Sequence, residues 1–377
     1  MTATNAKLLY ASTEESADAL YFAGFFVPDP VILMQVGRTR LGVFSRLEFG
    51  RAEKQSALDA LLPYEDLMAR AKKIYKSTRP GPAEIIRLLA EDRGLKSFHV
   101  PENFPAGLAL KLMKAGLDIQ PIEGAFFPQR ETKTEAEAEA IREGNRVAAV
   151  GIDAVRKALE AAEIRGDELW LKGKRLTSER LRTLIQLACM EEGGLANHVI
   201  AAGGDQACDP HAVGEGPLKA NELIIVDVFP RIMHSGYHGD MTRTFLKGKA
   251  SPEQKKLVDT VHKAQRAALA GIKAGVNGKT IHAEVDRIFK QTGYVTGQSR
   301  GVWEGFIHST GHGLGLEIHE SPRMSPVGDR LKKGVVVTVE PGLYYPGLGG
   351  CRIEDVVQVL DDGYDLLSEA PYEWEIA

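Results

Sequence analysis

Short apolar stretches alternate with helical patterns through the first third of the chain. Apolar residues recur at helical spacing around residues 84–91 and 104–115, between stretches whose length and apolar content are typical of strands. These strand-like stretches cover residues 7–11, 31–36, 41–45 and 97–100. The alternation predicts an α/β domain of modest size, and its residues indicate no chemistry of their own.

The pattern changes near residue 130, where a polar segment precedes a clear helix start. In Thr134-Glu-Ala-Glu137 the hydroxyl and the glutamate can each satisfy a free backbone amide of the other, which makes a capping box. A long helix should follow, to about Ala162. Because 377 residues are too many for one compact core, we expect two domains, over residues 1–130 and 131–377.

A helix pair followed by strands occurs twice in the second domain. The second pair opens with another capping box, Ser251-Pro-Glu-Gln254, which has proline at the first helical position. The predicted order is helices at 134–162 and 178–192, strands at 198–202 and 223–228, helices at 251–275 and 280–292, and strands at 335–340 and 352–360. This order favours two similar halves that close around a central sheet.

Composition and charge exclude several classes of protein. The chain has 26% charged residues and a formal net charge of -4 without any basic stripe, so it has no electrostatic case for binding nucleic acid. Its longest apolar runs, such as residues 31–36, are far shorter than the roughly 20 residues that a membrane span needs. The first thirty residues lack a basic start followed by an apolar stretch, and the three cysteines form no C-x-x-C pair. We therefore expect a cytoplasmic protein without an export signal.

Four carboxylates and a histidine stand on or beside the predicted strands of the second domain. Asp227 and Glu340 end strongly apolar runs, and Asp240, His312 and Glu354 lie near other strands of the same domain. Taken singly, each acid is better explained as an ordinary acid near a turn. Together they need another explanation, because buried charges must be paired or bound to a metal.

Two divalent cations would balance the four carboxylates, and the neutral imidazole would add a ligand without changing that sum. Oxygen-rich ligand sets with one nitrogen suit manganese, cobalt or zinc better than thiol-seeking ions. Two such ions about 3.5 to 4 Å apart can share a hydroxide and polarise a carbonyl at once, which is the chemistry of peptide hydrolysis.

Four stretches of the second domain carry a resemblance to a known family. They are Asp-Met-Thr-Arg-Thr at 240–244, the histidine- and glycine-rich run at 308–319, Val-Glu-Pro-Gly at 339–342 and Arg-Ile-Glu-Asp at 352–355. Together they resemble the M24 metallopeptidases, which include prolidases, aminopeptidase P and methionine aminopeptidases. The first domain favours the prolidase and aminopeptidase P branch, because methionine aminopeptidases lack such a domain. The resemblance implies a creatinase/prolidase-like α/β domain and then an α+β catalytic domain of the pita-bread fold, with pseudo-twofold halves.

The resemblance also implies roles for the five candidate ligands. Asp227 would bind one metal ion, and His312 with Glu340 would bind the other. Asp240 and Glu354 would bridge the two ions. Glu340 would in addition carry a proton from the attacking water to the leaving nitrogen.

The two aspartates depart from the usual spacing of the family. Asp227 and Asp240 stand 13 positions apart, two more than is usual. Extra residues in a hairpin loop cost little, so we expect the loop over residues 230–236 to bulge outward and leave both strand ends in place.

Four further residues would contact the substrate by the same resemblance, and a fifth by its position on a predicted strand. His211 and His319 match histidines that hold the substrate and stabilise the tetrahedral oxyanion, and His308 matches either a wall of the pocket or a residue that contacts the ligands from behind. Arg323 matches an arginine that grips the terminal carboxylate of the substrate in some prolidases, a task that suits a guanidinium fork. Arg352 stands two residues before the last acid, so on a strand both side chains would face the same side. Taken alone, His211 and Arg323 are equally well explained as residues of surface loops.

The leading hypothesis for function is a two-metal dipeptidase that hydrolyses Xaa-Pro, with manganese as the expected metal and cobalt or zinc as alternatives. An aminopeptidase that removes the residue before proline from longer peptides is the second hypothesis. A catalytically inactive binding protein of the same fold is the third, and the full set of five ligands disfavours it. The expected partners are proline-containing di- or oligopeptides and a second copy of the chain in a homodimer, with no nucleic acid and no membrane.

Overall fold

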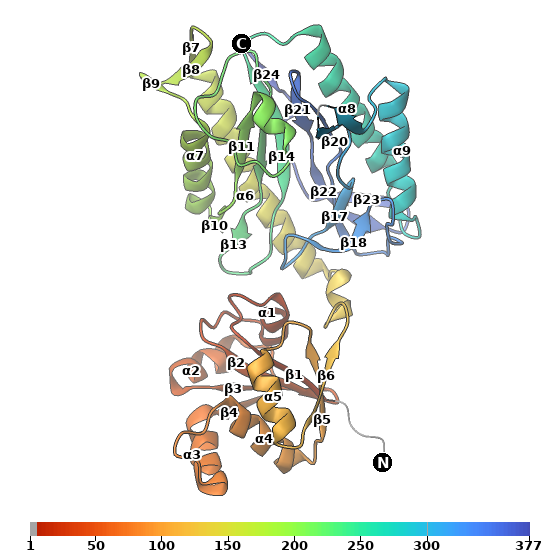
Figure 1. Ribbon diagram of the computed structural model, residues 1–377. Coiled ribbons are helices and arrows are strands. Elements are labelled where there is room, and N and C mark those ends of the chain that lie inside the picture. The colour runs from red at the N-terminus through yellow and green to blue at the C-terminus, as the bar shows by residue number, and fades with distance from the viewer. Residues whose placement is uncertain (1–5, 300) are drawn as a thin grey trace. The chain divides into compact units, whose positions relative to one another are not determined.

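The computed structural model describes residues 6–299 and 301–377. The chain divides into two compact units, Met1–Arg130 and Glu131–Ala377, whose colours run from red to yellow and from yellow to blue in Figure 1. Each unit has its own sheets, helices and hydrophobic cores.

The N-terminal unit is built on one mixed six-stranded sheet with the strand order β4-β3-β2-β1-β5-β6. Its strands are β1 (Ala6–Ala11), β2 (Val31–Val36), β3 (Thr39–Phe44), β4 (Ala60–Pro63), β5 (Ser97–Pro101) and β6 (Asp118–Ile122). Strands β1, β2 and β3 pair antiparallel, whereas β3 with β4, β1 with β5 and β5 with β6 pair parallel. The four strands expected from the apolar stretches are confirmed.

Both faces of this sheet are covered, which explains why the first four residues of β2, Val31 to Met34, are all apolar and buried. Leu8, Ile32 and Met34 enter one hydrophobic core, whereas Leu9 and Leu33 enter a second core. Since successive side chains of a strand point to opposite faces, the two cores lie on opposite sides of the sheet.

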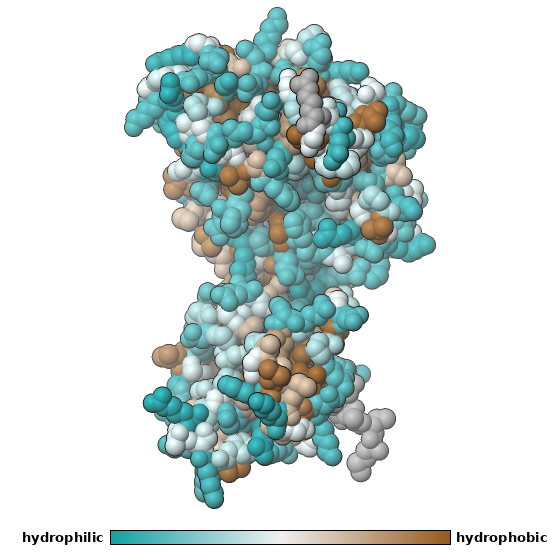
Figure 2. Space-filling view, in the orientation of Figure 1, coloured by the Kyte–Doolittle hydropathy of each residue, from teal (hydrophilic) through white to brown (hydrophobic). Residues whose placement is uncertain are grey.

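The described helices of this unit are α1 (Ala17–Ala23), α2 (Arg46–Gln55), α3 (Tyr64–Tyr75), α4 (Pro82–Arg93) and α5 (Ala106–Lys114). The sequence pattern predicted α4 and α5 but not α1, α2 or α3. Helix α2, for example, buries only Ala52 and so has no apolar period. The surface in view is mainly hydrophilic, with an apolar patch over α5, where Leu110 and Met113 are exposed (Figure 2).

Two helix pairs form the outer layers of the second unit, with strands between them (Figure 1). The pairs are α6 (Glu135–Glu160) with α7 (Ser178–Glu191), and α8 (Pro252–Ala270) with α9 (Gly278–Gln291). Both expected capping boxes are present, since the hydroxyls of Thr134 and Ser251 accept hydrogen bonds from the amides of Glu137 and Gln254. Helix α8 ends five residues earlier than expected, because the chain turns after it to bury Ile272 in a core.

Each helix pair packs on its own sheet. The first sheet is β11 (Ile200–Gly203), β12 (Ile224–Val228), β14 (Met241–Lys247) and β24 (Glu375–Ile376). The second, in the order β18-β17-β19-β22-β23, contains β17 (Gly311–Gly313), β18 (Glu320–Met324), β19 (Val336–Val339), β22 (Asp355–Leu360) and β23 (Gly363–Leu366). Helices α6 and α7 share a core with β12 and β14, and helices α8 and α9 share one with β19 and β22. The two expected halves, a helix pair and a sheet each, are therefore present.

Besides β4, β6, β17, β18, β23 and β24, further strands of two to four residues escaped prediction, because so few residues cannot show a period. They are β7 (Glu163–Arg165), β8 (Glu168–Leu171), β9 (Lys174–Arg175), β10 (Gly194–Leu195), β13 (Arg231–Ile232), β15 (Gly297–Ser299), β16 (Val302–Glu304), β20 (Gly342–Tyr345) and β21 (Gly349–Arg352), and the 3-10 helices are η1 (Pro128–Glu131) and η2 (Gly204–Cys208). None of the helices in the described ranges has the length and apolar content needed to cross a membrane.

The stretch 352–360, expected as one strand, is divided between two sheets. β21 ends at Arg352 and pairs with β20, whereas β22 begins at Asp355 and pairs with β19. Between them the amide of Glu354 donates to the carbonyl of Thr242 at 3.1 Å. The chain thus changes sheet at Glu354 and places this residue where β14 and β22 approach each other.

Candidate metal centre

One cavity of about 300 Å³ in the second unit is lined by all ten residues that the sequence singled out. They are Asp227, Asp240, His312, Glu340, Glu354, His211, His308, His319, Arg323 and Arg352. Its other lining residues are Ile200, Pro210, Phe229, Ser309 and Ile318. This cavity is called the site cavity below.

Strand ends from both sheets deliver the acids to the site cavity. Asp227 lies on β12 opposite Thr242 of β14, and Asp240 immediately precedes β14. Glu340 directly follows β19, and Glu354 occupies the change of sheet between β21 and β22. The apolar runs before Asp227 and Glu340 are therefore core strands that end at a polar centre.

Cross-strand register explains why two more residues face the same cavity. His312 on β17 lies directly opposite Arg323 on β18, and Ile200 on β11 lies opposite Asp227. Directly opposed residues of antiparallel strands project to the same face. The register therefore places Arg323 beside His312, although the two are 11 positions apart in the sequence.

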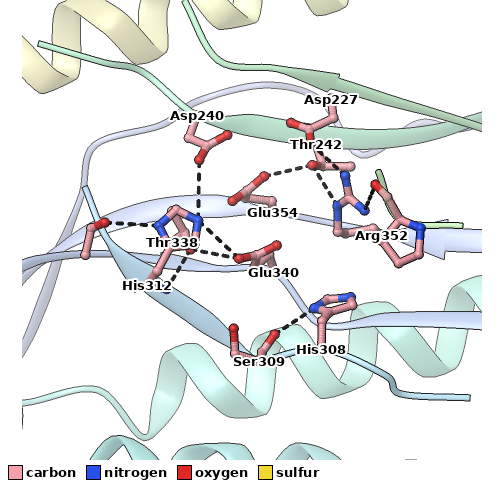
Figure 3. A network of polar contacts seen from close by, with 12 residues as sticks. Asp227, Asp240, Thr242, His308, Ser309, His312, Thr338, Glu340, Arg352 and Glu354 are labelled. Carbon is pink, nitrogen blue, oxygen red and sulfur yellow. Dashed lines mark hydrogen bonds and ion pairs between the residues drawn. The ribbon is translucent and has the colours of Figure 1, made fainter. Parts of the chain in front are cut away.

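Three of the expected ligands form a compact group. Asp240, His312 and Glu354 each offer one ligand atom, and these atoms all lie within 4.8 Å of one another. Nε2 of His312 is 3.7 Å from Oδ2 of Asp240 and 3.3 Å from Oε1 of Glu340. Figure 3 shows these side chains pointing toward one another from different strands, with Asp227 close by.

The electrostatics of this group call for additional positive charge. Burial, followed by the charges of neighbouring carboxylates, raises the pKa of Asp240 and of Glu354 well above the usual range. Burial also raises the pKa of Glu340 to about 7, although the Arg352 guanidinium opposes that shift. Among the described residues, Oδ1 of Asp227 is buried without a hydrogen-bond partner. Divalent cations would relieve this repulsion and occupy the free oxygen, so the donor set fits metal ions.

The histidine of the group has the form that a metal ligand requires. Burial lowers the pKa of His312 to about 4, so its imidazole is neutral at physiological pH. Its Nδ1 lies 3.0 Å from the carbonyl oxygen of Gly313. A hydrogen bond there places the proton on Nδ1 and leaves the Nε2 lone pair directed toward the carboxylates.

Arg352 is held on four sides at the wall of the site cavity. Its Nη2 donates to Oδ2 of Asp227 at 2.6 Å, and its Nε donates to the hydroxyl of Thr242 at 3.2 Å. Its Nη1 donates to the hydroxyl of Tyr344 at 3.0 Å and to the carbonyl of Pro210 at 3.4 Å. The guanidinium is therefore a fixed cation that orients the Asp227 carboxylate.

Sequence reasoning missed the hydroxyls that support the acids. The Thr242 hydroxyl donates to Oε2 of Glu354 at 2.7 Å. The Thr338 hydroxyl donates to Oε1 of Glu340 at 3.3 Å and accepts the amide of His312 at 3.1 Å. Strand alternation contained the signal, because Thr242 and Thr338 each stand two residues from a singled-out acid and so share its face.

The remaining histidines differ in exposure. His211 and His319 are exposed, and the His319 ring meets the His312 ring edge-on at 4.4 Å between centroids. His308 lies deeper, where its Nε2 is 2.8 Å from the hydroxyl of Tyr344. Burial lowers the pKa of His308 to about 3, so its ring is neutral and serves as a hydrogen-bonding wall.

The segment between the two aspartates is not a free bulge. Residues 231–232 form β13, which pairs antiparallel with β10, and the Tyr237 hydroxyl donates to Glu137 at 2.7 Å. The pairing of β12 with β14 is unbroken from Ile224 to Val228. The additional length is therefore built into a small sheet against the first helix pair, which corrects the simpler expectation.

Comparisons with known proteins agree with this geometry. Residues 139–361 match the model of metallopeptidase family M24. The chain is 31% identical over 282 residues to the Xaa-Pro dipeptidase of Pyrococcus furiosus. The aligned region covers 74% of this chain and 73% of the relative.

Solved structures show the same fold over almost the full length of the chain. An X-Pro aminopeptidase from Thermotoga maritima has a TM-score of 0.81 at 24% identity and covers 99% of this chain and 98% of its own. A prolidase from Pyrococcus furiosus has a TM-score of 0.78 at 24% identity, with 97% of each chain covered. The predicted α/β unit followed by a pita-bread domain is confirmed. The chain therefore belongs to metallopeptidase family M24 and is a peptidase that depends on divalent metal ions.

Proposed function

We propose that the protein is an Xaa-Pro dipeptidase whose site cavity holds two divalent metal ions, with manganese preferred and cobalt or zinc as substitutes. The observation that carries this proposal is the convergence of four carboxylates and one neutral histidine on a single cavity. The named dipeptidase relative supports the choice of Xaa-Pro as substrate. Oxygen-rich donors with one nitrogen support the choice of metal.

The ligands divide between the two ions according to their positions. Asp227 would hold one ion through the oxygen that Arg352 leaves free, and His312 with Glu340 would hold the other. Asp240 and Glu354 would hold both ions, which their raised pKa values and the closeness of their ligand atoms to that of His312 support. When bound, paired divalent ions supply Lewis acidity to the scissile carbonyl and lower the pKa of the attacking water.

The side chains of the chain itself carry the proton and hold the substrate. Glu340 accepts a proton from the attacking water and passes it to the leaving nitrogen of proline, a role that suits a carboxyl whose pKa burial raises toward 7. His211 and His319 hold the peptide and donate hydrogen bonds to the oxygen that becomes negative during attack. His308 forms the wall beside the proline ring, and Arg352 keeps Asp227 in place.

Arg323 sets the length of the substrate in this proposal. Its side chain is exposed on the site cavity beside His312, and the peptide amide of Arg323 is anchored to Asp329 at 3.1 Å. A guanidinium here can take the carboxylate that follows the proline of a dipeptide. The second candidate, an Xaa-Pro aminopeptidase, needs no such contact, and an X-Pro aminopeptidase also shares the fold.

The assembly and compartment are also proposed. We take the protein to be a cytoplasmic homodimer, and the free, buried state of Cys189, Cys208 and Cys351 supports a reducing compartment. Analytical ultracentrifugation of the full chain tests the dimer, and a monomer at all concentrations would refute it.

The deciding experiment compares substrates on metal-loaded protein. The full chain is freed of metal, loaded with Mn²⁺ and assayed on Gly-Pro, on Gly-Pro amide and on a longer peptide with proline second. A dipeptidase should prefer Gly-Pro in kcat/KM. Preference for the longer peptide would establish the aminopeptidase, and failure to cleave any of the three would refute both.

A further inference from the structure

Asn145 is a fully buried amide in the middle of the apolar face of α6, with 0% of its surface exposed. Both ends of this amide are bonded. Its Nδ2 donates to the carbonyl of Ile141 at 3.1 Å, and its Oδ1 accepts the backbone amide of Asp240 at 3.1 Å. A buried side-chain amide is costly unless it is hydrogen-bonded, so an apolar residue would be the simpler choice at this position of the helix. The contact to Asp240 is therefore the feature that requires explanation.

The backbone amide of Asp240 has no partner within the sheet. The ladder between β12 and β14 begins with Val228 opposite Met241, one residue after Asp240. A buried amide at this place needs an acceptor from another element. Asn145 supplies it from the helix.

The loop that carries Asp240 is fixed at three consecutive amides. The amide of His238 donates to the carbonyl of Gly315 at 2.9 Å, and that of Gly239 donates to the carbonyl of Pro230 at 2.9 Å. Asn145 then takes the third. Three different segments thus hold three successive residues, and the chain direction at Asp240 is fully set.

The helix and the loop meet in direct backbone contact. A Cβ atom on Gly239 would lie 2.1 Å from the carbonyl carbon and oxygen of Gly144, and one on Gly144 would lie 2.4 Å from the amide nitrogen of Gly239. Because both contacting residues must be glycine, the backbones of α6 and the loop are in direct contact and the distance between them is fixed. The Asn145 amide is consequently held at one distance from Asp240.

None of the described residues that line the site cavity belongs to α6. It nevertheless reaches Asp240, whose Oδ2 lies 3.7 Å from Nε2 of His312. We propose that Asn145 is a positioning residue, which fixes the Asp240 carboxylate through its backbone amide and so sets its ability to bind a divalent cation. The inference rests on the proposed function, because it takes Asp240 as a metal ligand.

The test uses Co²⁺ as the probe on the metal-free full chain. Titration by calorimetry gives the affinity, and the visible absorption spectrum reports the coordination of the bound ion. Asn145→Leu keeps the branched shape and the number of heavy atoms and removes both hydrogen bonds, whereas Asn145→Asp keeps the acceptor for the Asp240 amide. Loss of a group that orients a ligand typically weakens metal binding about 10- to 100-fold. We expect that loss and an altered spectrum in Asn145→Leu, and a spectrum like that of the wild type in Asn145→Asp.

Val147→Ala is the matched control on the same helix. Val147 is also 0% exposed and belongs to the core of this half. Its truncation should lower Tm and leave the Co²⁺ affinity and spectrum unchanged. If Asn145→Leu behaves like Val147→Ala, Asn145 is an ordinary core residue and the inference is overturned. The same holds if Asn145→Asp alters the spectrum as much as Asn145→Leu.

Asp240→Ala separates this failure from failure of the proposed function. If the wild type binds Co²⁺ and Asp240→Ala does not, the metal centre stands and the Asn145 variants decide the inference alone. If wild type and Asp240→Ala bind Co²⁺ equally, the metal centre itself is wrong.

Discussion

Arg352 and Asp227 form an ion pair of 2.6 Å between Nη2 and Oδ2, with 4% and 13% of their side chains exposed. Oδ1 of the same carboxylate has no hydrogen-bond partner among the described residues. One oxygen of Asp227 is thus neutralised by an arginine and the other is available for a metal ion. The Arg352 guanidinium and one metal ion can therefore bind the same carboxylate through different oxygen atoms.

Replacement of Arg352 should therefore destabilise the metal-free protein most. In Arg352→Met the Asp227 carboxylate keeps its buried position without a cation, which typically costs about 3 to 5 kcal/mol. Bound Mn²⁺ would supply the missing charge, so the loss of unfolding free energy should shrink when metal is present. Urea unfolding of both forms, with and without Mn²⁺, measures the difference. A loss that is independent of metal would show that Asp227 is not a ligand.

Arg243 offers a matched pair on the other side of Glu354. Its Nη2 donates to Oδ1 of Asp355 at 2.9 Å, and both side chains are almost fully buried, with 3% and 1% exposed. Asp355 does not line the site cavity. Arg243→Met should also cost about 3 to 5 kcal/mol. Arg243 also donates to the carbonyl of Glu354 at 2.6 Å, but the carboxylate that loses its cation is not a proposed ligand, so Mn²⁺ should restore less of this loss than of the Arg352→Met loss. Equal recovery by Mn²⁺ in both variants would mean that the metal effect is general and not specific to Asp227.

Removal of the metal should abolish activity and lower stability together. A ligand that binds only the folded state stabilises it by about 2.7 kcal/mol at 100 times its Kd. Chelation should therefore lower Tm, and Mn²⁺ or Co²⁺ should restore both Tm and hydrolysis of Gly-Pro. Glu354→Ala removes the carboxylate that is proposed to contact both ions and should weaken the binding of both. Full activity of a protein shown by elemental analysis to hold no transition metal would contradict the proposal.

The sequence predicted much of this fold, and each success has a physical reason. The capping boxes at Thr134 and Ser251 mark helix starts because their hydrogen bonds are local in sequence. Long helices such as α6 and α9 were predicted because their buried residues recur over several turns. Strand β12 was predicted because it is buried at every position.

The features that the sequence did not predict depend on contacts between distant segments. Helix α2 buries Ala52 and little else, so it has no apolar period to detect. The break of the stretch 352–360 reflects a change of sheet at Glu354, which depends on the positions of β19 and β20. The bond from Asp240 to Asn145 joins residues 95 positions apart, and nothing in the local sequence of either residue indicates it.

His312 and His319 should separate metal binding from turnover. Both line the site cavity with their rings 4.4 Å apart, yet the Nε2 of His312 faces Asp240 and Glu340 while His319 is exposed. His319→Ala should keep its metal and lose about 10²-fold or more in kcat, as expected for an oxyanion contact. His312→Ala should lose metal. Metal content by elemental analysis beside kcat checks both, and equal metal loss would mean that the ligand is wrongly assigned.

Arg323 should distinguish dipeptides from longer peptides. A dipeptide carries a carboxylate directly after proline, whereas a longer peptide or a C-terminal amide is neutral at that place. A charge-assisted contact contributes roughly 1.5 to 3 kcal/mol, about ten- to a hundredfold in kcat/KM. Arg323→Ala should lose that factor on Gly-Pro and much less on Gly-Pro amide or a tripeptide. Arg323→Lys should recover only part of the loss, because a point charge cannot reproduce the two-pronged fork.

Exposed Arg330, which donates to the carbonyl of Gly275 at 2.6 Å and does not line the site cavity, gives the control Arg330→Ala. Equal losses on all three substrates would make Arg323 a structural residue and would favour the aminopeptidase.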